Sequence, residues 1–260
     1  MGILKDPGWR AAIRRRLETD LLLGVAYVPL DLTPPAASRS APAIRTGVRP
    51  GMVQPVTDEE LARRIQALRV LDETRVRVCR SCKLCETRTQ TVFGQGHAAA
   101  RLVFVGEGPG YEEDQQGLAF VGKAGQLLTR MIAAMGLSRD EVFICNIVKC
   151  RPPDNRTPAP DEIAACWPYL DEQLRIIRPE VIVALGKPAA QTLLRTQESI
   201  GRMRGNWFEY YTSGSPSVGP ATPLMPTYHP AYLLRSPAEK GKAWSDLKQV
   251  MARLGLPVPR

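Results

Sequence analysis

The sequence predicts an α/β protein, specifically a three-layer α/β/α sandwich with a four-stranded parallel sheet. Four short apolar runs of strand length alternate along the chain with longer amphipathic segments of helical period. That alternation is typical of a parallel sheet with helices packed on both of its faces. Glycine-rich and polar loops follow the strand candidates, and the carboxyl ends of parallel strands are where such folds bind their ligands.

The first predicted helix of the main domain begins after Thr57, because Thr57-Asp58-Glu59-Glu60 is a capping-box pattern. Apolar residues recur at helical spacing along it, namely Leu61, Ile65, Leu68 and Leu71. The preceding residues 29–55 are rich in Pro, Ala, Ser and Thr and have no periodic pattern, which is typical of a linker. We therefore expect an N-terminal extension and linker over residues 1–56 and one main domain over residues 57–260.

The strand candidates are short and apolar, as buried parallel strands are. They are Leu102–Val105, Val142–Cys145, Val181–Leu185 and Leu224–Tyr228. The helical patterns cover residues 125–135, 161–177, 188–194 and 240–254. Two prolines complicate this interpretation: Pro226 weakens the last strand because it lacks an N–H group, and Pro168 should kink or restart the helix over residues 161–177.

The composition limits the classes of function. With 260 residues, 44% of them hydrophobic, the chain can bury one substantial core. Lys and Arg number 35 against 26 Asp and Glu, a formal net charge of +9, which favours a polyanion such as DNA or RNA as a partner. No apolar run reaches the length of about 18 residues that spans a bilayer, and the short apolar stretch at residues 21–28 lacks a clean cleavage site. We therefore expect a cytoplasmic protein with no membrane partner.

The six cysteines favour metal ligation over disulfides, because the chain shows no export signal. The pair Cys79-x2-Cys82 has a strong ligand spacing, and the pair Cys150-x15-Cys166 a moderate one. Together they predict one four-thiolate site, and their spacing fits structural zinc and an iron–sulfur cluster equally well. Cys85 and Cys145 are surplus, and we interpret both as non-ligands.

The loops after the four strands should converge on one crevice. They are Gly106–Gly110, Asn146, Gly186 and His229. The glycine loop has neither the Gly-Lys-Ser/Thr of a P-loop nor the dinucleotide fingerprint, so no nucleotide cofactor is expected. In this crevice Glu107 can orient a water molecule or stabilise positive charge, and His229 supplies an imidazole on a stiff His-Pro turn.

The segment after His229 has two interpretations. It reads Pro-Ala-Tyr-Leu-Leu-Arg, so its apolar and aromatic side chains suit insertion into a base stack and its arginine suits a phosphate contact. Alternatively, Leu233 and Leu234 begin a helix that faces the core.

Four segments, in this order, closely resemble the family 4 uracil-DNA glycosylases. They are Gly106–Gly110, Gly117–Leu128, Asn146–Pro153 and the loop Tyr228–Arg235. The resemblance extends over about residues 60–254. It implies a four-stranded parallel sheet between helices and a structural 4Fe-4S cluster. The implied ligands of that cluster are Cys79, Cys82, Cys150 and Cys166.

The resemblance also implies a role for each residue of the crevice. Phe120 would stack on an extrahelical uracil, and Asn146 would hydrogen-bond its pyrimidine edge. His229 would stabilise the departing base. The wider superfamily often has a water-activating Asp at the position of Gly108, so Gly108 is expected to line the substrate site while Glu107 positions the water. Leu233 would fill the gap that the flipped base leaves in the duplex.

The implied protein is a monomeric DNA glycosylase. It would flip deoxyuridine out of single- or double-stranded DNA and hydrolyse the N-glycosidic bond, leaving an abasic site in base excision repair. A related branch that traps uracil covalently uses a histidine in a basic insertion, and residues 147–162 contain none, which disfavours that alternative. A non-catalytic nucleic-acid-binding module stabilised by a metal site would explain the charge and the cysteines. It would not explain why Phe120, Asn146 and His229 occur together.

Overall fold

A six-stranded sheet forms the centre of the fold. The computed structural model describes residues 56–212 and 221–258, and these belong to one compact unit. The strand order is β1-β3-β2-β4-β6-β5. The bounds are β1 (Gln95–Gly96), β2 (Leu102–Gly106), β3 (Phe143–Asn146), β4 (Val181–Leu185), β5 (Phe208–Tyr210) and β6 (Thr222–Thr227). The four central strands are parallel, and β1 and β5 are antiparallel at the two edges.

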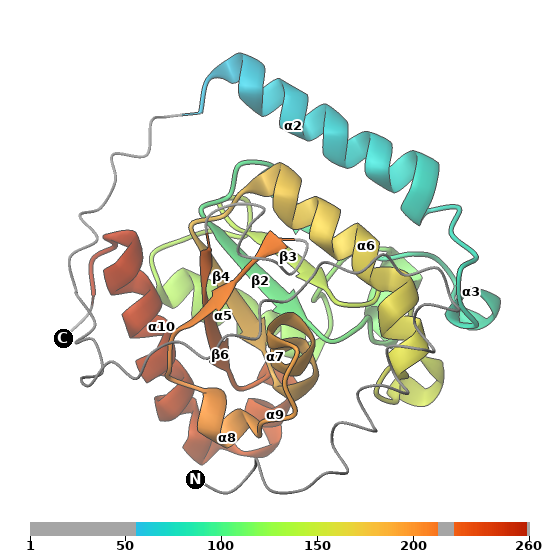
Figure 1. Cartoon of the computed structure of the whole chain (residues 1–260). Coiled ribbons are helices and arrows are strands. Elements are labelled where there is room, and N and C mark those ends of the chain that lie inside the picture. The colour runs from blue at the N-terminus through green and yellow to red at the C-terminus, as the bar shows by residue number, and fades with distance from the viewer. Residues whose placement is uncertain (1–55, 213–220, 259–260) are drawn as a thin grey trace, which may run out of the picture. The chain divides into compact units, whose positions relative to one another are not determined.

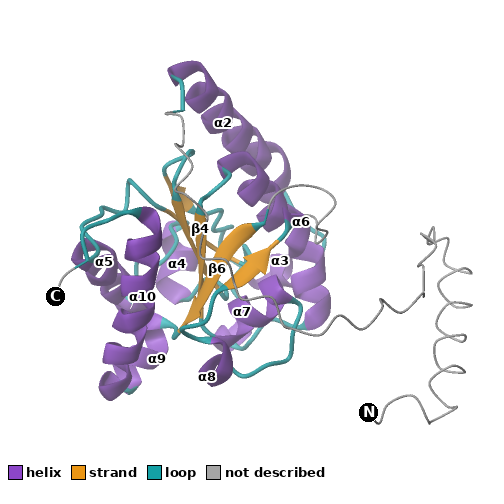
Figure 2. Cartoon of the chain, turned by 60° about the vertical axis from the view of Figure 1, so that its left-hand side comes forward, coloured by secondary structure: helices purple, strands orange, loops and turns teal. Residues whose placement is uncertain are grey.

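Helices cover both faces of this sheet (Figure 1, Figure 2). Their bounds are α2 (Asp58–Leu71), α3 (Leu84–Thr87), α4 (Tyr111–Gln116), α5 (Lys123–Ala134), α6 (Pro160–Ile177), α7 (Lys187–Leu194), α8 (Ile200–Met203), α9 (Pro230–Arg235) and α10 (Lys240–Leu254). The predicted α/β/α sandwich with four parallel strands is therefore confirmed, and two short antiparallel strands extend its sheet. Within the described ranges no helix is long and apolar enough to cross a membrane.

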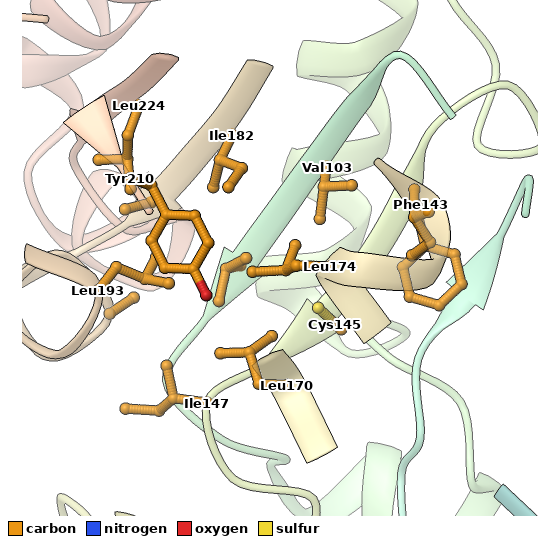
Figure 3. Packing of buried hydrophobic residues seen from close by; sticks show 14 of the residues in the cluster. Val103, Phe143, Cys145, Ile147, Leu170, Leu174, Ile182, Leu193, Tyr210 and Leu224 are labelled. Carbon is orange, nitrogen blue, oxygen red and sulfur yellow. The ribbon is translucent and has the colours of Figure 1, made fainter. Parts of the chain in front are cut away.

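The two faces of the sheet carry two separate cores, because successive side chains of a strand point in opposite directions. Val103 and Ile182 pack with α6 and α7 in one core, which Figure 3 shows from close by. Leu102 and Val183 pack with α5 and α10 in the other. All five residues of β2 and of β4 are buried, as expected for central strands covered on both faces.

Helix α2 begins as the sequence predicts. The Thr57 hydroxyl accepts a hydrogen bond from the Glu60 amide at 3.3 Å, and Leu68 and Leu71 are buried. Ile65, which belongs to the same apolar spacing, is 53% exposed. The helix lies along α6 as an outer element (Figure 1), and Leu68 and Leu71 are its buried residues.

The two prolines leave their elements intact. Helix α6 is continuous from Pro160 to Ile177 although Pro168 lies inside it. In β6, Pro226 lies beyond the register that pairs β5 with Thr222–Leu224, so its missing N–H removes no bond to that strand. The linker predicted over residues 29–55 lies outside the described residues.

Candidate active site

An open pocket of about 690 Å³ lies where the loops at the carboxyl ends of β2, β3 and β6 meet. Its lining contains five residues that the sequence selects as catalytic or substrate-binding. They are Glu107, Gly108, Phe120, Asn146 and His229. Parallel strands bring these loops together because their carboxyl ends share one edge of the sheet.

A glycine at the end of β2 lets two of these side chains meet. Gly106 pairs with Asn146 across the sheet. A Cβ atom on Gly106 would lie 2.4 Å from Asn146 Oδ1 and 2.5 Å from Phe120 Cζ. Real Cβ atoms do not approach other atoms so closely, so a side chain here would displace the amide or the ring.

The Asn146 side chain has an unusual hydrogen-bonding state. Asn146 is 1% exposed, yet among the described residues its Oδ1 atom has no hydrogen-bond partner. Buried polar atoms in native proteins are almost always paired, because an unpaired one costs about 1–3 kcal/mol. An acceptor that is kept buried and unpaired beside a pocket is suited to a ligand that brings its own N–H group.

Phe120 is held in a strained backbone conformation next to this acceptor. Its φ angle is 54°, in the left-handed region that a bulky residue rarely adopts. Arg139 donates to the carbonyl oxygens of Ala119 at 2.7 Å and of Phe120 at 3.2 Å. The Phe120 ring lies 5.6 Å from the His229 ring, tilted by 34°, so the two rings border the same space.

The buried carboxylate of Glu113, which the sequence did not single out, ties the loops of the pocket together. It accepts hydrogen bonds from the backbone amides of Gly110 at 3.1 Å and of Val121 and Gly122 at 2.9 Å each. These bonds join the glycine loop to the segment that carries Phe120. The available signal was its position in the first turn of α4, where an acidic residue commonly bonds the cap.

His229 is neutral at physiological pH. Its Nδ1 atom accepts a hydrogen bond from the Ala231 amide at 3.1 Å, so the proton of the neutral ring is on Nε2. Burial, and to a smaller degree the nearby Arg235, lower the pKa of His229 to about 4. His229 therefore offers the pocket an uncharged N–H donor.

Glu107 is partly buried in the glycine loop. Burial raises the pKa of its carboxyl, although a hydrogen bond from Thr157 opposes the shift. A carboxylate with a raised pKa accepts a proton more readily than an exposed one, as a group that orients and deprotonates water must.

The predicted intercalating residue, Leu233, does not face the pocket. It is 1% exposed and packs against Leu127 and Ala243 in the core. The next residue, Leu234, is 39% exposed and lines the pocket with Tyr232. Helix α9 therefore turns the Leu233 side chain inward and presents Leu234 to the pocket.

The cysteines form a second site away from the first pocket. The four predicted ligands, Cys79, Cys82, Cys150 and Cys166, line one pocket. Cys85, which the sequence predicts to be a non-ligand, lines it too. Cys145 packs in the core on the face of the sheet that α6 and α7 cover.

Hydrogen-bond donors surround the sulfur atoms of this second site. Cys79 Sγ accepts from the Ser81 amide at 3.4 Å, Cys166 Sγ from the Lys149 amide at 3.2 Å, and Cys150 Sγ from the Arg88 guanidinium at 3.0 Å. Burial raises the pKa of the Cys166 thiol to about 12. Backbone N–H donors and a cation beside a sulfur favour its thiolate form and are typical of the surroundings of thiolate ligands. As the described residues lie in this structure, no group of three or more His, Cys, Asp or Glu side chains is arranged to hold a metal ion.

Comparisons with known proteins agree with this geometry. The family model described as the uracil DNA glycosylase superfamily matches residues 93–248. A type-4 uracil-DNA glycosylase of Thermotoga maritima is 48% identical over 163 residues, which cover 62% of this chain and 81% of that protein. One of Saccharolobus solfataricus is 44% identical over 184 residues, covering 69% of this chain and 83% of that protein.

A type-5 uracil-DNA glycosylase of Pyrobaculum aerophilum is more distant. It is 35% identical over 115 residues, which cover 38% of this chain and 50% of that protein. Because the type-4 matches are both higher in identity and longer, the chain belongs to the uracil-DNA glycosylase superfamily and, within it, to the type-4 uracil-DNA glycosylases.

Proposed function

We propose that this protein removes uracil from DNA by hydrolysing the N-glycosidic bond of a flipped-out deoxyuridine, the first step of base excision repair. The observation that carries this proposal is the unpaired acceptor of Asn146 in one pocket with the neutral N–H donor of His229. Uracil presents the complementary pattern, an N3–H donor next to carbonyl acceptors. The domain that does this is residues 57–260.

Recognition of the base uses Asn146 and Phe120. The Oδ1 atom of Asn146 accepts the N3–H of uracil, so that the buried acceptor becomes paired. The Phe120 ring stacks on the base and fills the space between the pocket wall and His229. Gly108 contributes backbone to the pocket lining, and a Cβ there would lie 3.0 Å from a Val148 methyl carbon, so glycine lets the loop pass close to that side chain.

Bond cleavage relies on His229 and Glu107. The bond between C1′ and N1 breaks with its electron pair leaving on uracil, and negative charge builds on O2, where His229 Nε2–H donates a hydrogen bond. A single such donor typically contributes about 10²–10³-fold in rate. Glu107 holds a water molecule against C1′, stabilises the positive charge on the sugar and takes the proton of the attacking water.

Contacts to DNA come from the rim of the same pocket. Its lining includes the cationic side chains of Lys123, Arg156 and Arg235, and cations at a rim bind phosphate groups without reading sequence. We assign the role of filling the vacated base position to Leu234 rather than Leu233, because only Leu234 is exposed there.

We propose a 4Fe-4S cluster for the cysteine site, held by Cys79, Cys82, Cys150 and Cys166. The support is the donor set, since these four cysteines line one pocket and the sulfurs of Cys79, Cys150 and Cys166 accept hydrogen bonds from backbone amides or from a guanidinium group. Such donors offset the negative charge of a thiolate-bound cluster. When bound, the cluster would tie distant loops together and supply no step of the hydrolysis. The cytoplasmic location and the monomeric state stay predictions.

The function is tested with an oligonucleotide that contains one deoxyuridine. After incubation and alkaline cleavage of abasic sites, a denaturing gel should show repeated turnover by the wild-type protein. His229→Ala and Asn146→Ala should each lose about 10²–10³-fold in rate. The control is His97→Ala. His97 is the other histidine of the chain, is exposed and does not line the pocket, so this variant should keep wild-type activity. A covalent adduct would favour the trapping branch, and bound but uncut DNA would favour a non-catalytic module.

A further inference from the structure

Lys149 is a buried cation between the two sites. It is 1% exposed, and its Nζ atom donates to the Asn146 carbonyl at 2.9 Å and to the Gln173 side chain at 2.5 Å. Both acceptors are neutral. Among the ion pairs of the described residues, none joins Lys149 to a carboxylate.

Burying a lone ammonium group costs several kcal/mol unless negative charge lies nearby. The cysteine pocket supplies that charge if its sulfurs are thiolates. Lys149 lines this pocket together with Arg88, and no Asp or Glu of the described part of the chain does. Its own backbone amide donates to Cys166 Sγ, and the next residue in the chain is the ligand Cys150. The pocket therefore combines two cations with sulfur ligands, as a centre of net negative charge requires.

The ammonium group also fixes the turn that carries Asn146. The bond from Lys149 Nζ to the Asn146 carbonyl closes the turn of residues 146–149 at the end of β3. The Ile147 amide of the same peptide donates to the Gly106 carbonyl at 2.9 Å. The peptide that follows Asn146 is thus held from two directions, and the position of the Asn146 side chain depends on this turn.

We propose that Lys149 couples the cysteine site to the uracil pocket. Its charge offsets that of the thiolates, and the same ammonium group positions Asn146 through the backbone carbonyl. Lys149 is a positioning residue, since it touches neither the base nor the reacting atoms. The inference rests on the proposed function, because it takes the cysteine site to hold a cluster and Asn146 to bind uracil.

The test compares Lys149→Met and Lys149→Gln with the wild-type chain. Lys83→Met is the matched control, because Lys83 also adjoins a cysteine ligand but is exposed. The first readout is the rate at which a chelator removes iron from the purified holoprotein, followed by the visible absorbance. Loss of a partner around metal ligands typically costs about 10–100-fold in metal affinity, so both Lys149 variants should release iron about 10–100-fold faster, and Lys83→Met should match the wild type.

The second readout is binding to DNA that contains non-hydrolysable 2′-fluorodeoxyuridine, measured against the same DNA with thymidine. Lys149→Met should lose most of the preference for the uracil analogue while keeping its affinity for the thymidine DNA. Lys149→Gln retains an N–H donor and should lose less of the preference. If Lys149→Met does not fold, Lys149→Gln still tests the role of the charge, because its smaller neutral side chain fits the buried space.

The outcomes separate the two proposals. Iron release from both Lys149 variants at the wild-type rate would overturn the charge role, and an unchanged preference for the uracil analogue would overturn the positioning role. A wild-type protein that binds no iron would refute the cluster and this inference together. A wild-type protein that holds iron but does not cleave uracil DNA would refute the proposed activity while the iron-release result still decides the role of the charge.

Discussion

Gly106→Ala should slow the enzyme about 10²-fold by displacing the side chains of Asn146 and Phe120, although both residues remain present. The added Cβ atom would lie 2.4 Å from Asn146 Oδ1 and 2.5 Å from Phe120 Cζ. Ordinary contacts between non-bonded carbon atoms are about 3.5–4.0 Å, so the amide and the ring must each move by about 1 Å. A misplacement of that size can cost about 10²-fold in rate, which corresponds to about 2.7 kcal/mol of transition-state stabilisation.

The assay is kcat/KM on a deoxyuridine oligonucleotide, together with thermal unfolding to show that the variant is folded. The matched control is Gly201→Ala on α8, where an added Cβ would meet no atom within 4 Å. We expect the Gly201 variant to keep wild-type activity and the Gly106 variant to lose about 10²-fold. A folded Gly106→Ala protein with wild-type kcat/KM would refute the packing argument, because Asn146 and Phe120 would then work from displaced positions.

Three other perturbations have defined outcomes. The pKa of His229 is lowered from 6.5 to about 4, so the unfolded chain binds more protons between these values and stability falls as the pH drops from 6.5 to 4, by up to about 3 kcal/mol. Denaturant unfolding should show this loss of unfolding free energy in the wild type and a smaller loss in His229→Asn. Equal losses in the two proteins would contradict the lowered pKa of His229. Leu234→Ala should slow cleavage of double-stranded DNA more than of single-stranded DNA, whereas Leu233→Ala should cost about 2–5 kcal/mol of stability through the cavity it leaves. The reverse pattern, read from gel rates and melting curves, would restore Leu233 as the residue that enters the duplex. Cys150→Ala should yield little soluble, folded protein because the cluster ties distant loops together, and an unaffected melting curve would argue against that role.

The sequence predicts the central strands because they are continuous apolar runs bounded by turn residues. It does not predict β1 and β5, which have two and three residues and are too short to show a period. Their pairing is decided by the neighbouring strands. Local pattern therefore suffices for the buried centre of the sheet and fails at its edges.

The same contrast applies to the site. Asn146 and His229 follow strands, so topology alone brings them to one pocket. Two adjacent leucines do not reveal which side of α9 faces the core, so the sequence does not predict that Leu233 is buried and Leu234 exposed. The bonds of Glu113 appear only when two loops meet in space.

In the proposed mechanism Phe120, Asn146 and His229 together bind one everted uracil. The most direct measurement is a crystal structure with DNA that contains 2′-fluorodeoxyuridine. We predict uracil stacked on the Phe120 ring, with Asn146 Oδ1 at about 3 Å from N3 and His229 Nε2 at about 3 Å from O2. A base that stays in the duplex, or that lies outside this pocket, would contradict the account.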